Sequence, residues 1–126
     1  MKIRVYYEDT DLGGIVYHAN YLKFCERARS EVFFQNSLSP CFEGGEFVVL
    51  NLEASFKSTA KLGETLDVGT ELLNISRSFL LLRQCVYKEE RLVFDMSIKL
   101  GFLKEGKIAR LSETSQVRLQ EIFNGS

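Results

Sequence analysis

The spacing of hydrophobic residues changes along the chain from a period of two to a helical period and back again. In Lys2–Glu8, the apolar side chains Ile3, Val5 and Tyr7 alternate with the residues between them, which predicts a first strand. From Ala19 to Asn36 the apolar residues recur every three or four positions, which predicts one amphipathic helix. Its apolar stripe consists of Tyr21, Phe24, Cys25, Ala28 and Val32. No proline or glycine interrupts this stretch.

The second half of the chain is rich in strand-like segments. A loop at Ser37–Gly45 contains the only proline and a glycine pair. The four segments that follow are Glu46–Thr59, Thr65–Ile75, Phe79–Lys88 and Leu92–Lys104. Because short polar connections separate them, we expect antiparallel hairpins. A short fifth piece at Lys107–Leu111 and a closing helix over Ser112–Phe123 complete the pattern.

This order of elements predicts an α+β fold in a single domain that spans residues 1–126. One helix covers only one face of such a sheet. The strands are rich in apolar side chains that need a cover, among them Phe79, Leu81, Val93, Met96 and Ile98. They offer more apolar surface than one helix buries, so we expect a second subunit.

Composition narrows the classes of function. The 16 Lys and Arg against 17 Asp and Glu give a net charge of −1, which disfavours nucleic-acid binding. A single histidine excludes a metal site with two histidine ligands in one chain, and we expect neither metal nor cofactor. The three cysteines show no CxxC spacing, and neither a signal peptide nor a run of about 20 apolar residues is present. We therefore expect a cytoplasmic protein without a membrane span.

The chemistry is concentrated in Tyr7–Tyr21, which joins the first strand to the long helix. This segment contains three carboxylates, the pair Gly13-Gly14 and the only histidine, His18. The first turn of a helix offers free N–H groups and a partial positive charge, which can polarise a carbonyl oxygen. Glycines allow positive φ angles and a close approach of ligand to backbone. A carboxylate beside a polarised carbonyl is suited to acyl hydrolysis, as nucleophile or general base.

The same residues also have simpler interpretations. Asp9 or Asp11 can order the turn through hydrogen bonds to backbone N–H groups, and His18 can be an ordinary surface or core imidazole. An EF-hand calcium loop starting at Asp9 is not supported. Such a loop needs ligands at its fifth and twelfth positions, which here hold Gly13 and Asn20. No GxGxxG or GxSxG motif is present, which leaves a phosphate loop and a serine hydrolase unsupported.

Three stretches together resemble a known family. They are Tyr6-Tyr7-Glu8-Asp9-Thr10-Asp11, Gly14-Ile15-Val16-Tyr17-His18-Ala19-Asn20-Tyr21-Leu22 and Glu26-Arg27-Ala28-Arg29. This pattern is similar to the signature of the hotdog-fold acyl-CoA thioesterases, in particular the YbgC type of the 4-hydroxybenzoyl-CoA thioesterase family. A looser resemblance continues through Phe56-Lys57-Ser58-Thr59-Ala60 and Gly63-Glu64. The resemblance implies a sheet wrapped around the long helix, paired into homodimers and often homotetramers, with active sites at subunit interfaces.

The resemblance also assigns roles to single residues. Asp11 matches the catalytic aspartate, which acts as nucleophile or as general base toward water. The backbone N–H of His18 matches the donor to the thioester carbonyl. Gly14 would let the thioester approach the backbone, and Tyr7 would shape the pocket.

Three basic residues, Lys57, Lys61 and Arg77, are candidates for contacts with the phosphates of coenzyme A.

In this interpretation the protein hydrolyses an acyl-CoA to the free acid and coenzyme A. One alternative is a hotdog dehydratase. Another is a non-catalytic scaffold that binds acyl-CoA or acyl carrier protein, linked to the Tol–Pal envelope system. The apolar residues of the helix and of the Phe79–Leu82 stretch fit a short pocket or a long tunnel, so chain length stays open.

Overall fold

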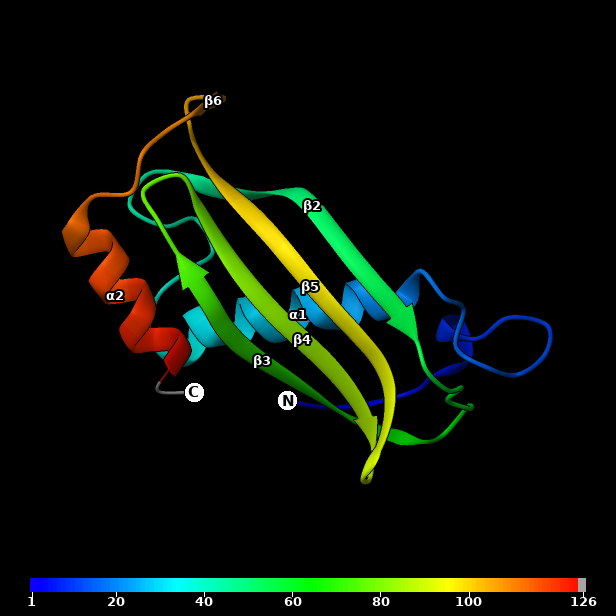
Figure 1. Ribbon diagram of the computed structural model, residues 1–126. Helices are drawn as coiled ribbons and strands as arrows, with labels where there is room; N and C mark the ends of the chain where they lie inside the picture. The colour runs from blue at the N-terminus through cyan, green and yellow to red at the C-terminus, as the bar shows by residue number, and fades with distance from the viewer. Residues whose placement is uncertain (125–126) are drawn as a thin grey trace.

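In the computed structural model, which describes residues 1–124, an antiparallel sheet curls along one long helix (Figure 1). The strands are β1 (Lys2–Arg4), β2 (Glu46–Phe56), β3 (Thr65–Ile75), β4 (Phe79–Lys88), β5 (Arg91–Lys104) and β6 (Lys107–Ile108). The helices are the short 3₁₀ helix η1 (Tyr7–Asp9), the long α1 (Asn20–Gln35) and the C-terminal α2 (Glu113–Asn124). The expected α+β hotdog architecture is confirmed.

The strands lie in the order β1-β3-β4-β5-β2, and β6 pairs with the end of β5. Short turns join β3, β4 and β5, as the polar breaks in the sequence predict. The chain leaves β2 at one side of the sheet and crosses to β3, so β2 becomes an edge strand that pairs only with β5 among the described strands. One side of an 11-residue strand is therefore free to pair with another strand.

Three strands end earlier than expected, and the last of them, expected over Lys107–Leu111, ends at Ile108. The first strand ends at Arg4 instead of Glu8, because a turn of 3₁₀ helix follows. The Tyr6 N–H donates to a carboxylate oxygen of Asp9 at 2.8 Å, and this side-chain acceptor replaces a strand partner. The strand expected over Glu46–Thr59 ends at Phe56, because the N–H groups of Lys57 and Ser58 both donate to the Val93 carbonyl of β5 and the regular ladder stops there.

The core lies between α1 and the concave face of the sheet. From the helix it contains Tyr21, Phe24, Cys25, Ala28, Val32 and Phe33. From β5 it contains alternating side chains that include Phe94, Met96, Ile98, Leu100 and Phe102. The apolar surplus expected from Val93, Met96 and Ile98 is thus absent, because one chain buries all three. Large apolar side chains are exposed elsewhere, including on β2 and on the loop before α1.

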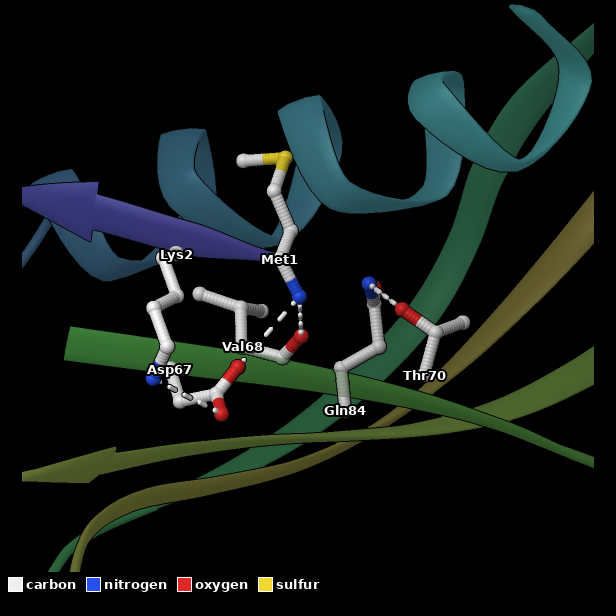
Figure 2. Close-up of polar contacts among 6 residues, drawn as sticks. All are labelled: Met1, Lys2, Asp67, Val68, Thr70 and Gln84. Atoms are coloured by element: carbon white, nitrogen blue, oxygen red, sulfur yellow. Dashed lines mark hydrogen bonds and ion pairs between the residues drawn. The ribbon is translucent and has the colours of Figure 1, made fainter. Parts of the chain in front are cut away.

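One polar side chain, Gln84 of β4, lies fully buried in this core. Its amide nitrogen donates to the Cys25 carbonyl of α1 at 2.8 Å and to the Thr70 hydroxyl of β3 at 3.0 Å. Figure 2 shows the Gln84 side chain directed from β4 toward α1, beside Thr70. Its amide oxygen accepts a hydrogen bond from Arg29 at 3.2 Å, so the helix is tied to the sheet at its middle.

In the part of the chain that the structure describes, no helix has the length and apolar character needed to cross a membrane.

Candidate active site

The loop between β1 and α1 folds back on itself and is held by its own backbone. An isolated bridge pairs Thr10 with Val16, and the Tyr17 N–H donates to the Asp9 carbonyl at 2.9 Å. The same carbonyl accepts a hydrogen bond from the side-chain amide of Asn20, at the start of α1. Asp9 is buried and serves as the internal anchor of the loop.

Asp11 lies at the tip of this loop and is exposed. One carboxylate oxygen accepts the Gly13 N–H at 2.9 Å, while the other has no hydrogen-bond partner among residues 1–124. Gly14 follows with a φ of +78°, a left-handed conformation that favours glycine, and its N–H donates to the Asp11 carbonyl. The turn-ordering interpretation is confirmed for both aspartates, and it leaves one oxygen of Asp11 open to a ligand.

His18 lies two residues before α1, whose first helical residue is Asn20. Within the described chain, the backbone N–H of His18 donates to no acceptor, and the imidazole nitrogens make no hydrogen bond. The ring packs instead between Tyr17, with ring centroids 4.5 Å apart, and Phe56, with centroids 6.0 Å apart. A free N–H ahead of a 16-residue helix lies where the helix dipole favours negative charge.

Phe56 is a site residue to which the sequence interpretation gave no role. It ends β2 and contacts the rings of His18, Tyr21 and Phe94. Tyr21 stacks on Phe94 with centroids 5.1 Å apart, and burial raises the pKa of its phenol above the ordinary value. Even so, 54% of Phe56 is exposed, which leaves an aromatic face open beside His18. The only available signal was its position directly before the Lys57-Ser58-Thr59-Ala60 stretch.

The segment after β2 places Lys61, one of the three predicted phosphate contacts, against the loop between β1 and α1. The Val16 N–H donates to the Ala60 carbonyl at 2.8 Å, and Ile15 forms an isolated bridge with Lys61. Lys57 follows β2 directly, and its side chain is exposed. Tyr7, in η1 on the same side of the molecule, is 84% exposed.

Arg77 lies apart from these residues. It occupies the turn between β3 and β4, at the end of the sheet beside α2 (Figure 1). Its carbonyl accepts the Leu111 N–H, just before α2. The 11-residue β3 separates this turn from the loop at Asp11, by about 36 Å at 3.3 Å per residue. Within one chain, the structure therefore does not bring Arg77 together with Lys57 and Lys61.

Across residues 1–124, no cluster of three or more His, Cys, Asp or Glu side chains is arranged to hold a metal ion.

Comparisons with known proteins decide the family. A model described as the thioesterase superfamily matches residues 13–94. The chain belongs to that superfamily. It is 44% identical over 112 residues to the acyl-CoA thioesterase YbgC of Helicobacter pylori, covering 82% of this chain and 84% of that protein. It is 35% identical over 121 residues to the YbgC of Haemophilus influenzae, covering 92% and 88% of the two chains.

The fold agrees with solved structures of this thioesterase superfamily. The crystal structure of a probable thioesterase from Bartonella henselae superposes with a TM-score of 0.84 at 29% identity, covering 89% of this chain and 97% of that one. The resemblance to the YbgC type is therefore confirmed, and with it the assignment of the chain as an enzyme of the thioesterase class.

Proposed function

We propose that this enzyme hydrolyses acyl-CoA thioesters at the loop that carries Asp11 and His18. The observation that supports this most is the pair of groups left open on one folded loop. These are an exposed carboxylate oxygen on Asp11 and the backbone N–H of His18, which has no acceptor within residues 1–124. Hydrolysis of a thioester needs a base or nucleophile and a hydrogen-bond donor for the carbonyl oxygen. A free carboxylate oxygen and a free N–H at the start of a helix supply these two groups.

In the proposed reaction, the thioester carbonyl oxygen accepts the His18 N–H. The Asp11 carboxylate either attacks the carbonyl carbon, forming an acyl–Asp11 anhydride that water then cleaves, or removes a proton from an attacking water. The carbon–sulfur bond breaks, the sulfur leaves as coenzyme A and takes up a proton, and water supplies the second oxygen of the acid. Developing charge on the carbonyl oxygen is held by the backbone donor, an effect worth about 2.7–4 kcal/mol per donor in other acyl-transfer enzymes.

Four further residues belong to the proposed substrate site within one chain. Tyr7 and Gly14 line the approach to the thioester, and Lys57 and Lys61 meet the phosphates of coenzyme A. For Lys61 this is supported by its bridge to Ile15 in the catalytic loop. Arg77 remains a candidate for a phosphate contact, at the opposite end of the sheet.

We propose a homodimer as the working unit, able to pair further into a homotetramer. The free edge of β2 supports this, because an uncovered 11-residue edge strand favours pairing with a second copy. Large apolar side chains are also left exposed around the loop and this edge. They are Leu12 at 109%, Phe56 at 54%, Val49 at 49% and Leu50 at 48%. A partner chain on this edge would cover them and enclose the site.

All three cysteines, Cys25, Cys41 and Cys85, are free thiols, in keeping with the reducing cytoplasm.

The experiment that tests the function is release of free thiol from purified protein given a panel of acyl-CoA substrates. We expect thiol release with at least one acyl chain, and no enoyl product, which distinguishes hydrolysis from dehydration. Tight acyl-CoA binding with no thiol release from any substrate would contradict the proposal. It would favour the alternative of a scaffold for acyl-CoA or acyl carrier protein, with its link to the Tol–Pal system.

A further inference from the structure

One asparagine side chain ties the loop between β1 and α1 to the long helix. Asn20 is the first residue of α1, and its side-chain amide nitrogen donates to the Asp9 carbonyl at 2.9 Å. Among the described residues, no other side-chain hydrogen bond joins this loop to that helix. Asn20 is partly buried, which shields the bond from water. The proposed function gives this residue no role.

The Asp9 carbonyl is a junction between the two groups of the proposed site. It also accepts the Tyr17 N–H at 2.9 Å, so one oxygen atom holds both ends of the loop. Along the chain, Asp11 follows this carbonyl by two residues, and His18 follows Tyr17 directly. The position of the His18 N–H relative to the Asp11 carboxylate therefore depends on this junction.

The backbone of Asn20 acts on the same peptide unit that carries the proposed donor. Its N–H donates to the Tyr17 carbonyl at 2.9 Å and closes a turn in which His18 is the second residue. The Tyr17 carbonyl and the His18 N–H belong to one planar peptide unit and point in opposite directions. Fixing the carbonyl therefore fixes the direction of the His18 N–H.

The Asn20 side chain also leaves the start of the helix open. Asparagine often caps a helix by accepting a backbone N–H with its side-chain oxygen. Here the N-cap residue is Ala19, which makes no side-chain cap, and Asn20 uses its amide nitrogen as a donor to the loop. A side-chain acceptor at this place would compete with a substrate carbonyl for the open N–H groups. The amide thus holds the loop without occupying the donor that the proposed reaction needs.

We propose that Asn20 is a positioning residue for the reaction, and that its side-chain amide keeps the His18 N–H aligned with the Asp11 carboxylate. The inference rests on the proposed function, because it takes those two groups as the reacting pair. A displacement of about 1 Å between reacting groups can cost about 10²-fold in rate. Since Asn20 acts through the Asp9 carbonyl, we expect its substitution to lower kcat and to leave KM nearly unchanged.

Two substitutions remove the same donor in different ways. Asn20→Ala deletes the amide but leaves the Asp9 carbonyl with its Tyr17 N–H donor, so that oxygen keeps a partner. Alanine is also a strong helix former, so the start of α1 is not weakened. Asn20→Asp keeps the shape of the side chain but has no N–H to donate, and a carboxylate is favourable in the first turn of a helix.

Asn36→Ala is the matched control. The side-chain amide of Asn36 donates to the Val32 carbonyl at 2.7 Å, at the opposite end of α1 from the proposed site. This variant loses the same kind of hydrogen bond from the same helix, so it reports the effect of a purely structural contact. Urea denaturation compares the stability of all three variants with that of the parent.

Thiol release is measured as kcat and KM for the acyl-CoA that the parent hydrolyses fastest. We expect both Asn20 variants to lose about tenfold to a hundredfold in kcat with KM within about threefold, and Asn36→Ala to match the parent. A kcat within about twofold of the parent in both Asn20 variants would overturn the inference. An equal loss in Asn36→Ala would overturn it too, because any weakening of α1 would then lower the activity.

A binding measurement separates this inference from the proposed function. S-trifluoroacetonyl-CoA carries a hydrated ketone that resembles a tetrahedral intermediate, whereas S-propyl-CoA has no carbonyl group. By isothermal titration calorimetry, we expect Asn20→Ala to bind the ketone about tenfold more weakly than the parent and to bind S-propyl-CoA equally well. If the parent releases no thiol from any acyl-CoA, the proposed function fails, while this selective loss still supports the role of Asn20. Equal losses of affinity for both ligands, or no loss for either, contradict the inference, whatever the activity.

Discussion

The imidazole of His18 packs edge-on against the ring of Phe56, with centroids 6.0 Å apart and planes at 85°. This contact joins the start of α1 to the end of β2, two parts of the chain separated by 37 residues. The imidazole ring is thus packed against another side chain, while the backbone N–H of the same residue has no acceptor in the described chain. We therefore expect different roles for the imidazole side chain and the backbone N–H of His18.

Substitutions at His18 should separate these roles. His18→Ala keeps the backbone N–H and removes only a ring without hydrogen bonds, so we expect about a tenfold loss of kcat/KM or less. His18→Pro removes the N–H itself, and the loss of one oxyanion donor costs about 10²–10³-fold in kcat. Circular dichroism checks that both variants fold. If alanine and proline reduce turnover equally, the backbone donor is not the group that matters.

Asp11→Asn should abolish most thioester turnover and leave the fold intact. The asparagine oxygen can still accept the Gly13 N–H, but the base or nucleophile is lost, a change of about 10²–10⁴-fold. Glu8→Gln is the matched control, because it removes one exposed negative charge from the same loop. The measurement is thiol release from every acyl-CoA that the parent hydrolyses. Nearly full activity of Asp11→Asn on all of them would show that the assignment is wrong.

Gln84→Leu should destabilise the protein although it keeps roughly the same volume. It leaves the Arg29 guanidinium and the Thr70 hydroxyl without their buried partner, and such unpaired groups cost about 1–3 kcal/mol each. Thr70→Val is the milder comparison, since Gln84 then still donates to the Cys25 carbonyl. Urea denaturation measures the free energy of unfolding. A Gln84→Leu variant as stable as the parent would indicate that the network contributes nothing net.

Stability should fall in alkaline solution because of a buried thiol. Burial raises the pKa of Cys25 from an ordinary value of 9.0 to about 12. Below pH 9 the thiol is neutral in both states, and this contribution to stability is complete. Between these pKa values the unfolded thiol loses its proton and the folded one keeps it, so the free energy of unfolding falls, by at most about 1.4 kcal/mol per pH unit.

Cys25→Ala provides the comparison for this prediction. The variant lacks the thiol and should show a shallower decline of unfolding free energy above pH 9, measured by urea denaturation at several pH values. Burial also raises the pKa values of Tyr21 and Cys85, so a smaller decline remains. Parallel pH profiles for parent and variant would contradict the assignment to Cys25.

Leu12→Asp should weaken the proposed homodimer without unfolding the chain. The Leu12 side chain is fully exposed in the single chain, so only a partner could lose contacts. We expect the dissociation constant from analytical ultracentrifugation to rise by about tenfold or more. Leu73→Asp, at another exposed leucine on β3, should leave it unchanged. Equal effects of both substitutions would argue against an interface at the catalytic loop.

Much of the fold could be predicted because its signals are local. The bounds of β3 and β4 agree with the alternation of apolar residues, and α1 agrees with its apolar stripe to within one residue at each end. The first strand was predicted too long, because alternation through Tyr7 cannot show that Asp9 captures the Tyr6 N–H. The surplus assigned to Met96 and Ile98 was wrong for a related reason, since the side of the sheet that α1 covers depends on register.

The sequence by itself determined the family, the order of helix and strands, and the loop in which Asp11 and His18 lie, because these depend on residue types at short, fixed spacings. Only the tertiary structure decided that Phe56 borders His18 and that Arg77 lies at the far end of the sheet. Those relations join residues far apart in the chain. They are set by strand order and register, which local patterns of polarity do not encode.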